Sequence, residues 1–294
     1  MLERVVPTGV TCPPRDMLRT LLLTSGALTA FAANSLLCRA ALGSLAIDPA
    51  SFTTLRIASG AAFLAIVSLL RTERARGTPR PGVASVAALF IYMSCFSFAY
   101  IDLGAGTGAL ILFGAVQLTM FLTAVRSGER PKAREWIGVS LAALGLVLLV
   151  LPGLSAPSPL GAVLMTVAGV GWGIYSLLGR HGQGALAETT RNFLYCVPLA
   201  FLLSVTMLPS AHITTPGVLL ALASGIAASG FGYVIWYAAL KNLSAARAAT
   251  VQLAAPVLAA FGGVLLLDEV LTLRLSGTAV LILGGIGLAV VARR

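Results

Sequence analysis

Tyrosine, tryptophan and amide side chains within long apolar stretches are the residues that could do chemistry in this sequence. Polar atoms in such stretches find no water and need another partner, because hydrocarbon supplies none. Aromatic rings can pack against the apolar part of a small organic solute, while amides hydrogen-bond to its charged ends. The candidate solute-binding residues are Asn34, Tyr92, Tyr100, Trp172, Tyr175, Tyr233, Trp236 and Gln252.

Two groups of these aromatic residues have the spacing of one helix face. Tyr92, Phe96 and Tyr100 follow one another at intervals of four, and Tyr233 and Trp236 lie three apart in a later stretch. Each group therefore lies on one side of its helix, which indicates a cavity between helices. Lipid-interface anchoring and ordinary helix packing remain alternatives for each ring.

Charged residues avoid the middle of the apolar stretches. The ten Asp and Glu residues fall at stretch ends or in loops, and Arg56 is assigned to the point where the second stretch opens. An ionisable group at mid-membrane usually marks an ion or proton pathway. We therefore expect an uncharged cavity of modest affinity, and facilitated transport or exchange in place of a proton relay. Asp102, which a shift of one helical turn would bury, is expected at a solvated helix end.

Patterns typical of catalysis or metal binding are missing from the sequence. It has no HExxH motif, no Walker loop and no GxSxG with a histidine to serve it. The four cysteines are scattered without a CxxC pair, as small apolar residues would be. We therefore expect no catalytic residue, no cofactor and no metal ion, and a chain that is not an enzyme.

Glycine and proline within the stretches are expected to shape the helices. Gly169, Gly171 and Gly173 form a glycine-rich run, but no strand precedes it as a nucleotide-binding loop requires, so we expect close helix packing. Pro256 lies one turn from Gln252 and lacks the N–H that a helix needs, which predicts a hinge beside the cavity. An inert kink is the alternative.

The elements that must position these residues are membrane helices. Of 294 residues, 58% are apolar and 10% charged, whereas soluble proteins carry about 25% charged residues. This composition excludes an ordinary cytosolic enzyme, a disordered chain and a secreted disulfide scaffold. A bilayer core needs about 20 helical residues. Ten apolar stretches of this kind occur, at 18–37, 52–70, 83–101, 107–125, 136–151, 160–178, 193–208, 217–240, 248–267 and 275–291.

The basic residues predict the orientation. Of the 20 Lys and Arg residues, all but Arg39, Arg56 and Arg274 fall in tails and loops on the side of the N-terminus. Because cytoplasmic loops of membrane proteins are enriched in Lys and Arg, both termini are expected in the cytoplasm, with residues 1–17 as a cytoplasmic tail. The same bias explains the net charge of +10 without a nucleic-acid partner.

The two halves of the chain repeat one another. SLLCR at 35–39 matches SLLGR at 176–180, and TTLR at 53–56 matches TTR at 189–191. Glu129 and Glu269 each precede the last stretch of their half, where a carboxylate would favour the helix N-terminus. Five spans is an odd number, so the second half enters the membrane from the opposite side. Such inverted halves are the usual architecture of secondary transporters.

Ten spans in two inverted fives, an arginine opening the second span and a glutamate before the last span of each half resemble the drug/metabolite transporter superfamily, in its EamA-type branch. The resemblance covers residues 18–291. It implies an all-α membrane protein with two EamA-like five-helix repeats, 18–151 and 160–292. It also implies export of small organic solutes, and the exporters of aromatic and other amino acids are the branch we expect.

We therefore expect a monomeric carrier in the inner membrane, multi-pass, that exports amino acids or related metabolites by alternating access. Its partners would be that small-molecule substrate and the lipid bilayer. Carriers for nucleotide-sugars or drugs remain an alternative, as do a membrane channel and a lipid-handling enzyme. A nucleotide-sugar would require basic residues facing the cavity, and saturation with counter-transport would separate a carrier from a channel.

Overall fold

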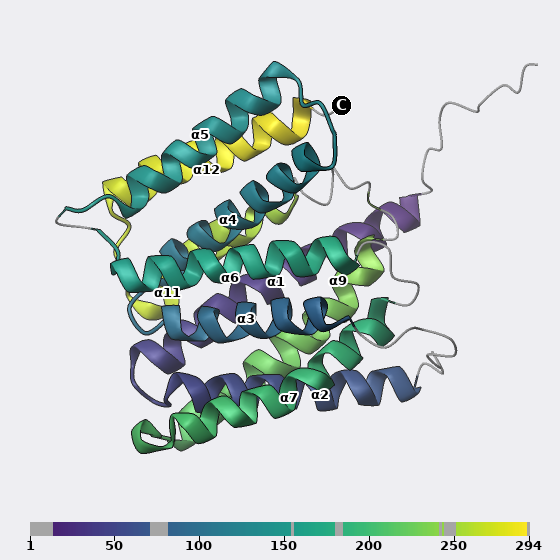
Figure 1. Cartoon of the computed structure of the whole chain (residues 1–294), viewed down its shortest axis with the longest axis vertical. Coiled ribbons are helices and arrows are strands. Elements are labelled where there is room, and N and C mark those ends of the chain that lie inside the picture. Colours follow the sequence, from purple (N-terminus) through teal and green to yellow (C-terminus); the bar gives the residue numbers. More distant parts are fainter. Residues whose placement is uncertain are drawn as a thin grey trace, which may run out of the picture.

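The computed structural model describes residues 14–70, 82–153, 156–179, 185–240, 243 and 251–292. Every named element in these residues is a helix, and the helices run side by side across the molecule (Figure 1). The elements are α1 (Pro14–Gly43), α2 (Pro49–Leu70), α3 (Val83–Ala99), α4 (Ala105–Arg126), α5 (Ala133–Val150), α6 (Pro159–Leu178), α7 (Ala185–Thr206), η2 (Leu208–Ser210), α8 (Thr215–Ala223), η3 (Ser224–Phe231), α9 (Gly232–Leu240), α11 (Ala254–Leu267) and α12 (Leu273–Ala292).

Each of the ten predicted spans falls on a helix or a continuous run of helices in the described ranges. Seven helices are long and apolar enough to cross a membrane, and one of them, Thr215–Leu240, is built from α8, η3 and α9. The shorter apolar helices α3 and α11, together with α7, supply the other three. Residues 1–13 of the predicted tail and 248–250 of the predicted ninth span lie outside the described residues.

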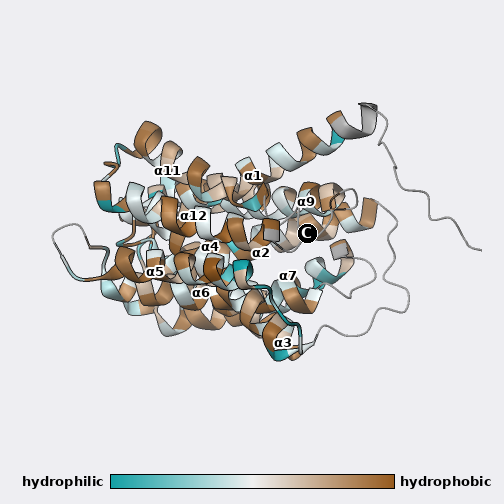
Figure 2. Ribbon diagram, turned by 90° about the horizontal axis from the view of Figure 1, so that it is seen from above, coloured by the Kyte–Doolittle hydropathy of each residue, from teal (hydrophilic) through white to brown (hydrophobic). Residues whose placement is uncertain are grey.

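The outer surface of the bundle is apolar. Leu69, Leu266 and Leu273 are 80%, 71% and 94% exposed, and apolar residues predominate along the helices (Figure 2). Soluble monomers rarely expose large contiguous apolar patches. Lipid solvates such side chains, and the helices meet the demand that backbone groups in hydrocarbon be satisfied internally. The fold is that of a multi-pass membrane protein.

The helices of the two halves pack on one another reciprocally. Three helices each contact their own counterpart in the other half, in the pairs α2 with α7, α4 with α11, and α5 with α12. The remaining contacts come in matched sets: α3 and α4 pack on α6, while α9 and α11 pack on α1. Exchanging the halves therefore reproduces the same contacts, which is the sign of an internal two-fold axis.

Counterpart helices run antiparallel. Thr54, near the start of α2, donates a hydrogen bond of 2.7 Å to the carbonyl of Ala200 near the end of α7. Thr190, near the start of α7, donates one of 3.4 Å to the carbonyl of Leu64 near the end of α2. The two-fold axis therefore lies across the helices, and the second half is inverted relative to the first, as the sequence predicts.

The glycine-rich run of α6 brings that helix against two neighbours. A Cβ on Gly169 would lie 2.7 Å from the carbonyl oxygen of Leu112 in α4, and one on Gly171 would lie 3.0 Å from that of Ala88 in α3. The expectation of close helix packing is confirmed. Trp172, which directly follows Gly171, is thereby held beside both α3 and α4.

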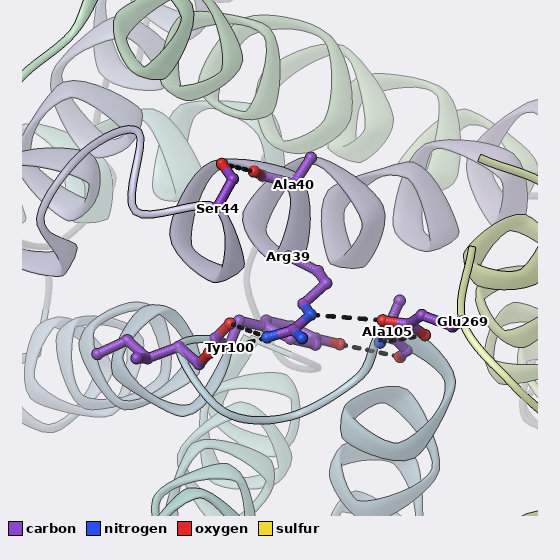
Figure 3. Close-up of polar contacts among 7 residues, drawn as sticks. Arg39, Ala40, Ser44, Tyr100, Ala105 and Glu269 are labelled. Carbon is purple, nitrogen blue, oxygen red and sulfur yellow. Dashed lines mark hydrogen bonds and ion pairs between the residues drawn. The ribbon is translucent and has the colours of Figure 1, made fainter. Parts of the chain in front are cut away.

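Glu269 joins the two halves at the end of the bundle opposite the start of α1. Both of its carboxylate oxygens accept from the backbone N–H of Ala105, the first residue of α4, at 2.9 Å. Its Oε1 also lies 3.4 Å from Nε of Arg39 in α1. Arg39 Nη1 donates to the carbonyl of Ile101 at 2.8 Å. Figure 3 shows this cluster, which ties α1 and the α3–α4 connection to the α11–α12 connection.

The expectation that Glu269 favours the start of the last helix is wrong. That helix begins only at Leu273. The preceding residue, Asp268, ends α11 in the left-handed conformation with φ 53°, so the chain turns Glu269 back toward α4. In the first half the start of the last helix, α5, is capped by Glu135, whose carboxylate accepts from the backbone N–H of Lys132.

We predict that Gly169→Ala destabilises the protein while Gly277→Ala does not. The added Cβ at Gly169 meets backbone and Ala115, whereas nothing lies within 4 Å at Gly277. Overpacking of this kind costs about 1–3 kcal/mol, and alanine is otherwise the better helix former. Melting temperatures in detergent provide the measurement. Equal melting temperatures for the two variants would contradict close packing at α6.

Candidate functional site

A small cavity lies between the two halves of the bundle. The first half lines it with Phe31, Asn34, Ser35, Tyr92, Phe96 and two residues of α4. The second half contributes Trp172, Ala228, Ser229, Tyr233 and Gln252. Its volume is about 30 Å³, which suits one or two water molecules. A larger solute therefore requires the halves to move apart.

Five of the predicted binding residues line this cavity: Asn34, Tyr92, Trp172, Tyr233 and Gln252. Their rings form a continuous aromatic wall across the seam between the halves. Trp172 stacks on Tyr233 with centroids 5.4 Å apart and an interplanar angle of 16°. Its ring also lies 4.9 Å from that of Tyr92. Such a wall offers ring faces to an apolar or cationic group.

Tyr100 and Trp236 support the wall from outside. The Tyr100 ring packs edge-on against Phe96 at 4.8 Å, and its hydroxyl donates to the carbonyl of Ala105. Trp236 packs edge-on against Phe31 at 5.7 Å. Neither residue lines the cavity. Tyr100 lies one helical turn beyond Phe96, and Trp236 lies one turn beyond Tyr233, where the helices already pack on one another.

Tyr175 also lies away from the cavity, in a polar cluster between α6, α7 and α9. Its hydroxyl donates to Thr189 and accepts from Asn192, both at 3.4 Å. Thr189 in turn donates to Tyr237. The hydroxyl is thus already satisfied by protein, so the structure gives Tyr175 a helix-packing position.

Asn34 and Gln252 are the amides of the cavity. Asn34 Oδ1 accepts a 2.7 Å hydrogen bond from Ser224 of η3, which leaves its amide nitrogen as the donor that a solute can use. Gln252 lies just before Leu253, where the helix is interrupted, and Pro256 is in the first turn of α11. Since proline lacks an N–H, the carbonyl of Gln252 has no helical partner. Hinge motion at Pro256 stays a prediction.

The side chains that line the cavity carry no charge, but Arg56, expected where the second stretch opens, is fully buried beside them. Its side chain is 0% exposed. Nε donates to Ser229 at 3.2 Å, and Nη2 donates to the Tyr92 hydroxyl at 3.4 Å. The guanidinium carbon lies 5.0 Å from the centroid of Phe96, a cation–π distance. All three of these contacts are residues that line the cavity.

The sequence pattern placed Arg56 too close to the helix end because it placed the start of α2 too late. The apolar stretch begins at Phe52, but α2 begins at Pro49, so Arg56 is about 10 Å along the helix axis. The sequence does contain a signal for the earlier start of α2, namely Asp48 followed by Pro49. Asp48 accepts from the backbone N–H of Ser51 at 2.9 Å, and an aspartate followed by proline is a typical helix start.

Ser229 was missed as well, since it lies in a π-helical segment that the sequence pattern does not reveal. η3 spans Ser224–Phe231 within an otherwise α-helical crossing, and such segments occur frequently at functional sites. Gly225 lets η3 approach α2, because a Cβ there would collide with Ser59 and with the carbonyl oxygen of Arg56. This close approach brings Ser229 within reach of the guanidinium.

Asp102 is exposed in the connection between α3 and α4, as expected. Its carboxylate accepts a 3.0 Å hydrogen bond from Ser158. In the described ranges no group of three or more His, Cys, Asp or Glu residues could hold a metal ion. The chemistry that the site can perform is therefore recognition, through ring faces, amides, hydroxyls and one guanidinium.

Both halves match one family model. Residues 18–151 and, again, residues 159–291 match the EamA-like transporter family. The chain belongs to this family. The cavity thus lies between its two EamA repeats, and the resemblance to the drug/metabolite transporter superfamily is confirmed.

Relatives of this EamA protein include an uncharacterised protein of Pseudomonas aeruginosa, 50% identical over 94% of this chain and 96% of that protein. A probable amino-acid metabolite efflux pump of Salmonella typhimurium is 30% identical over 65% of this chain and 70% of the pump. An uncharacterised transporter of Archaeoglobus fulgidus is 26% identical, covering 81% of this chain and 87% of that protein. One crystal structure has the same fold, with a TM-score of 0.66 at 22% identity over 94% of this chain and 98% of that one.

Proposed function

We propose that this EamA protein exports amino acids, including aromatic and apolar ones, or closely related metabolites. The observation that carries the proposal is the aromatic cavity at the seam between two inverted repeats, where Trp172 and Tyr233 stack beside Tyr92. Rings suit an apolar side chain, and the amides of Asn34 and Gln252 suit the polar ends of a zwitterion. The Salmonella relative, named a probable amino-acid metabolite efflux pump, supports this substrate class.

Alternating access is the mechanism we propose. Two inverted halves that meet at a central site can open it to either side by rocking, and the cavity of about 30 Å³ must widen in each turn of the cycle. The helix interruption before Pro256 is the proposed hinge. The driving force would be the solute gradient or an exchanged solute, with no chemical step at the protein.

In this proposal the protein acts as a monomer in the inner membrane, with both termini in the cytoplasm. Residues 1–17 form the tail, and 18–151 and 160–292 form the two moving halves. The clustering of Lys and Arg in the loops on the side of the N-terminus supports the orientation. The far ends of the helices, where Arg39 pairs with Glu269, would then face outward.

A nucleotide-sugar is less well matched. Arg56 is a basic group of the kind such a substrate requires, but two of its three nitrogens already donate to Ser229 and Tyr92. One guanidinium does not balance the charge of a diphosphate. The aromatic wall favours a smaller solute with one apolar group.

We predict that Trp172→Ala and Gln252→Ala lower amino-acid transport about tenfold per folded protein, because each removes a contact worth about 1–1.5 kcal/mol. Purified variants in liposomes loaded with a labelled amino-acid panel provide the measurement. Trp136→Ala is the matched control, since that ring is 47% exposed and packs on Phe121 away from the cavity. Normal transport by both cavity variants would show that the site is misplaced.

Binding should also change the fluorescence of Trp172. The chain has three tryptophans, so replacing Trp136 and Trp236 by phenylalanine leaves Trp172 as the reporter. We expect its emission to shift when a transported amino acid is added, because the solute alters the surroundings of the cavity wall. A variant that retains only Trp136 is expected to show no shift in emission when the amino acid is added. A response from Trp136 alone would place binding elsewhere.

A further inference from the structure

Arg56 is a buried cation, and no carboxylate of the described residues balances its charge. The ionisable side chains that act on it electrostatically are those of Tyr92, Cys38 and Tyr233, and none is a carboxylate. The ion pair between Arg39 and Glu269 lies at the far end of the bundle and does not involve Arg56. Burying an uncompensated charge is costly, and such groups in membrane proteins are by default functional.

One nitrogen of the guanidinium has no partner. Nε and Nη2 donate to Ser229 and Tyr92, whereas Nη1 is buried and donates no hydrogen bond to the described part of the protein. A buried N–H without a partner is rare and calls for an explanation. The two held nitrogens fix the plane of the group, so the free one points in a defined direction.

The guanidinium group that carries this nitrogen adjoins the cavity wall. Arg56 contacts Tyr92, Phe96 and Ser229, and all three line the cavity. Only this layer of side chains separates the guanidinium from the space that a solute must widen. Opening along this wall exposes Nη1 to the bound solute.

We propose that Arg56 Nη1 binds a single carboxylate of the transported solute and so makes a free carboxylate a requirement for transport. This inference rests on the proposed function and narrows its substrate class to monocarboxylates that carry an apolar or aromatic group. One positive charge balances one carboxylate. The unpaired Nη1 of Arg56 suits a carboxylate oxygen that approaches along an N–H bond. The ring wall then receives the rest of the solute.

The test compares solutes that differ only in the carboxylate. Liposomes that contain the wild-type protein are loaded with labelled phenylalanine. Unlabelled phenylalanine, phenylalanine amide and phenylethylamine are then compared as competitors of its transport. We expect phenylalanine to compete at a concentration roughly 30-fold or more below the other two, as loss of a buried charge partner implies. Equal competition by all three overturns the role of Arg56 but leaves amino-acid export standing. Absence of any phenylalanine transport, with the rest of the amino-acid panel also inactive, instead removes the proposed function.

Variants of Arg56 separate recognition from structural support. Arg56→Gln should lose the preference for phenylalanine over its amide, whereas Arg56→Lys, which keeps the charge, should retain part of it. A structural role would lower transport of all solutes together and leave their ratio unchanged. That result would overturn the inference.

Stability gives a readout independent of transport. Without solute, Arg56→Gln should melt no lower than the wild type, because an uncompensated buried charge is removed. Adding phenylalanine should raise the melting temperature of the wild type but not that of the variant. If Arg56→Gln does not fold, the comparison of the three solutes on wild-type protein and on Arg56→Lys still decides the question. If phenylalanine amide raises the melting temperature of the wild type as much as phenylalanine does, the proposal is contradicted.

Discussion

Hydrocarbon offers no hydrogen-bond partner, and every feature of this protein follows from that constraint. Backbone groups are satisfied within helices, so the chain crosses as helices and not as loops. Polar side chains must then be satisfied by other helices. Asn34 bonds with Ser224, and Tyr175 with Thr189, while the guanidinium of Arg56 is only partly satisfied. Among the buried polar atoms of the described residues that lack a hydrogen bond, Nη1 of Arg56 belongs to a charged group beside the cavity.

Much of the architecture could be predicted from sequence, because span length and repeat order can be read from local sequence patterns. The number of crossings, the inversion of the halves and the close packing at Gly169 all followed from local patterns. Burial of individual polar residues did not, because it depends on where a helix begins and which face its neighbour covers. Arg56 was assigned to the opening of the second stretch because the three residues at the start of α2 that precede this stretch were not counted as helix. Glu269 was assigned to the wrong helix because the left-handed turn at Asp268 is a conformation that Asp adopts only occasionally, so the residue type alone does not predict it.

The same limit explains the candidate site. Tyr92 and Tyr233 line the cavity, while Tyr100, two turns further along the same face as Tyr92, is fully buried in packing. Helical spacing identifies a face but not the depth at which that face meets a cavity. The π-helical segment η3 adds a further displacement that no periodicity of 3.6 residues describes, and it brings Ser229 to the guanidinium.

The pair between Arg39 and Glu269 joins an α1 residue to a connection of the opposite repeat, and its side chains are only 27% and 21% exposed. Separating the halves at that end must pull these charges apart and also release the first turn of α4. Attraction between partly shielded charges is stronger than in bulk water, and dissolved ions weaken it. Any opening of the halves at this end would therefore work against this attraction, and added salt would reduce that opposition only in part because the pair is partly buried.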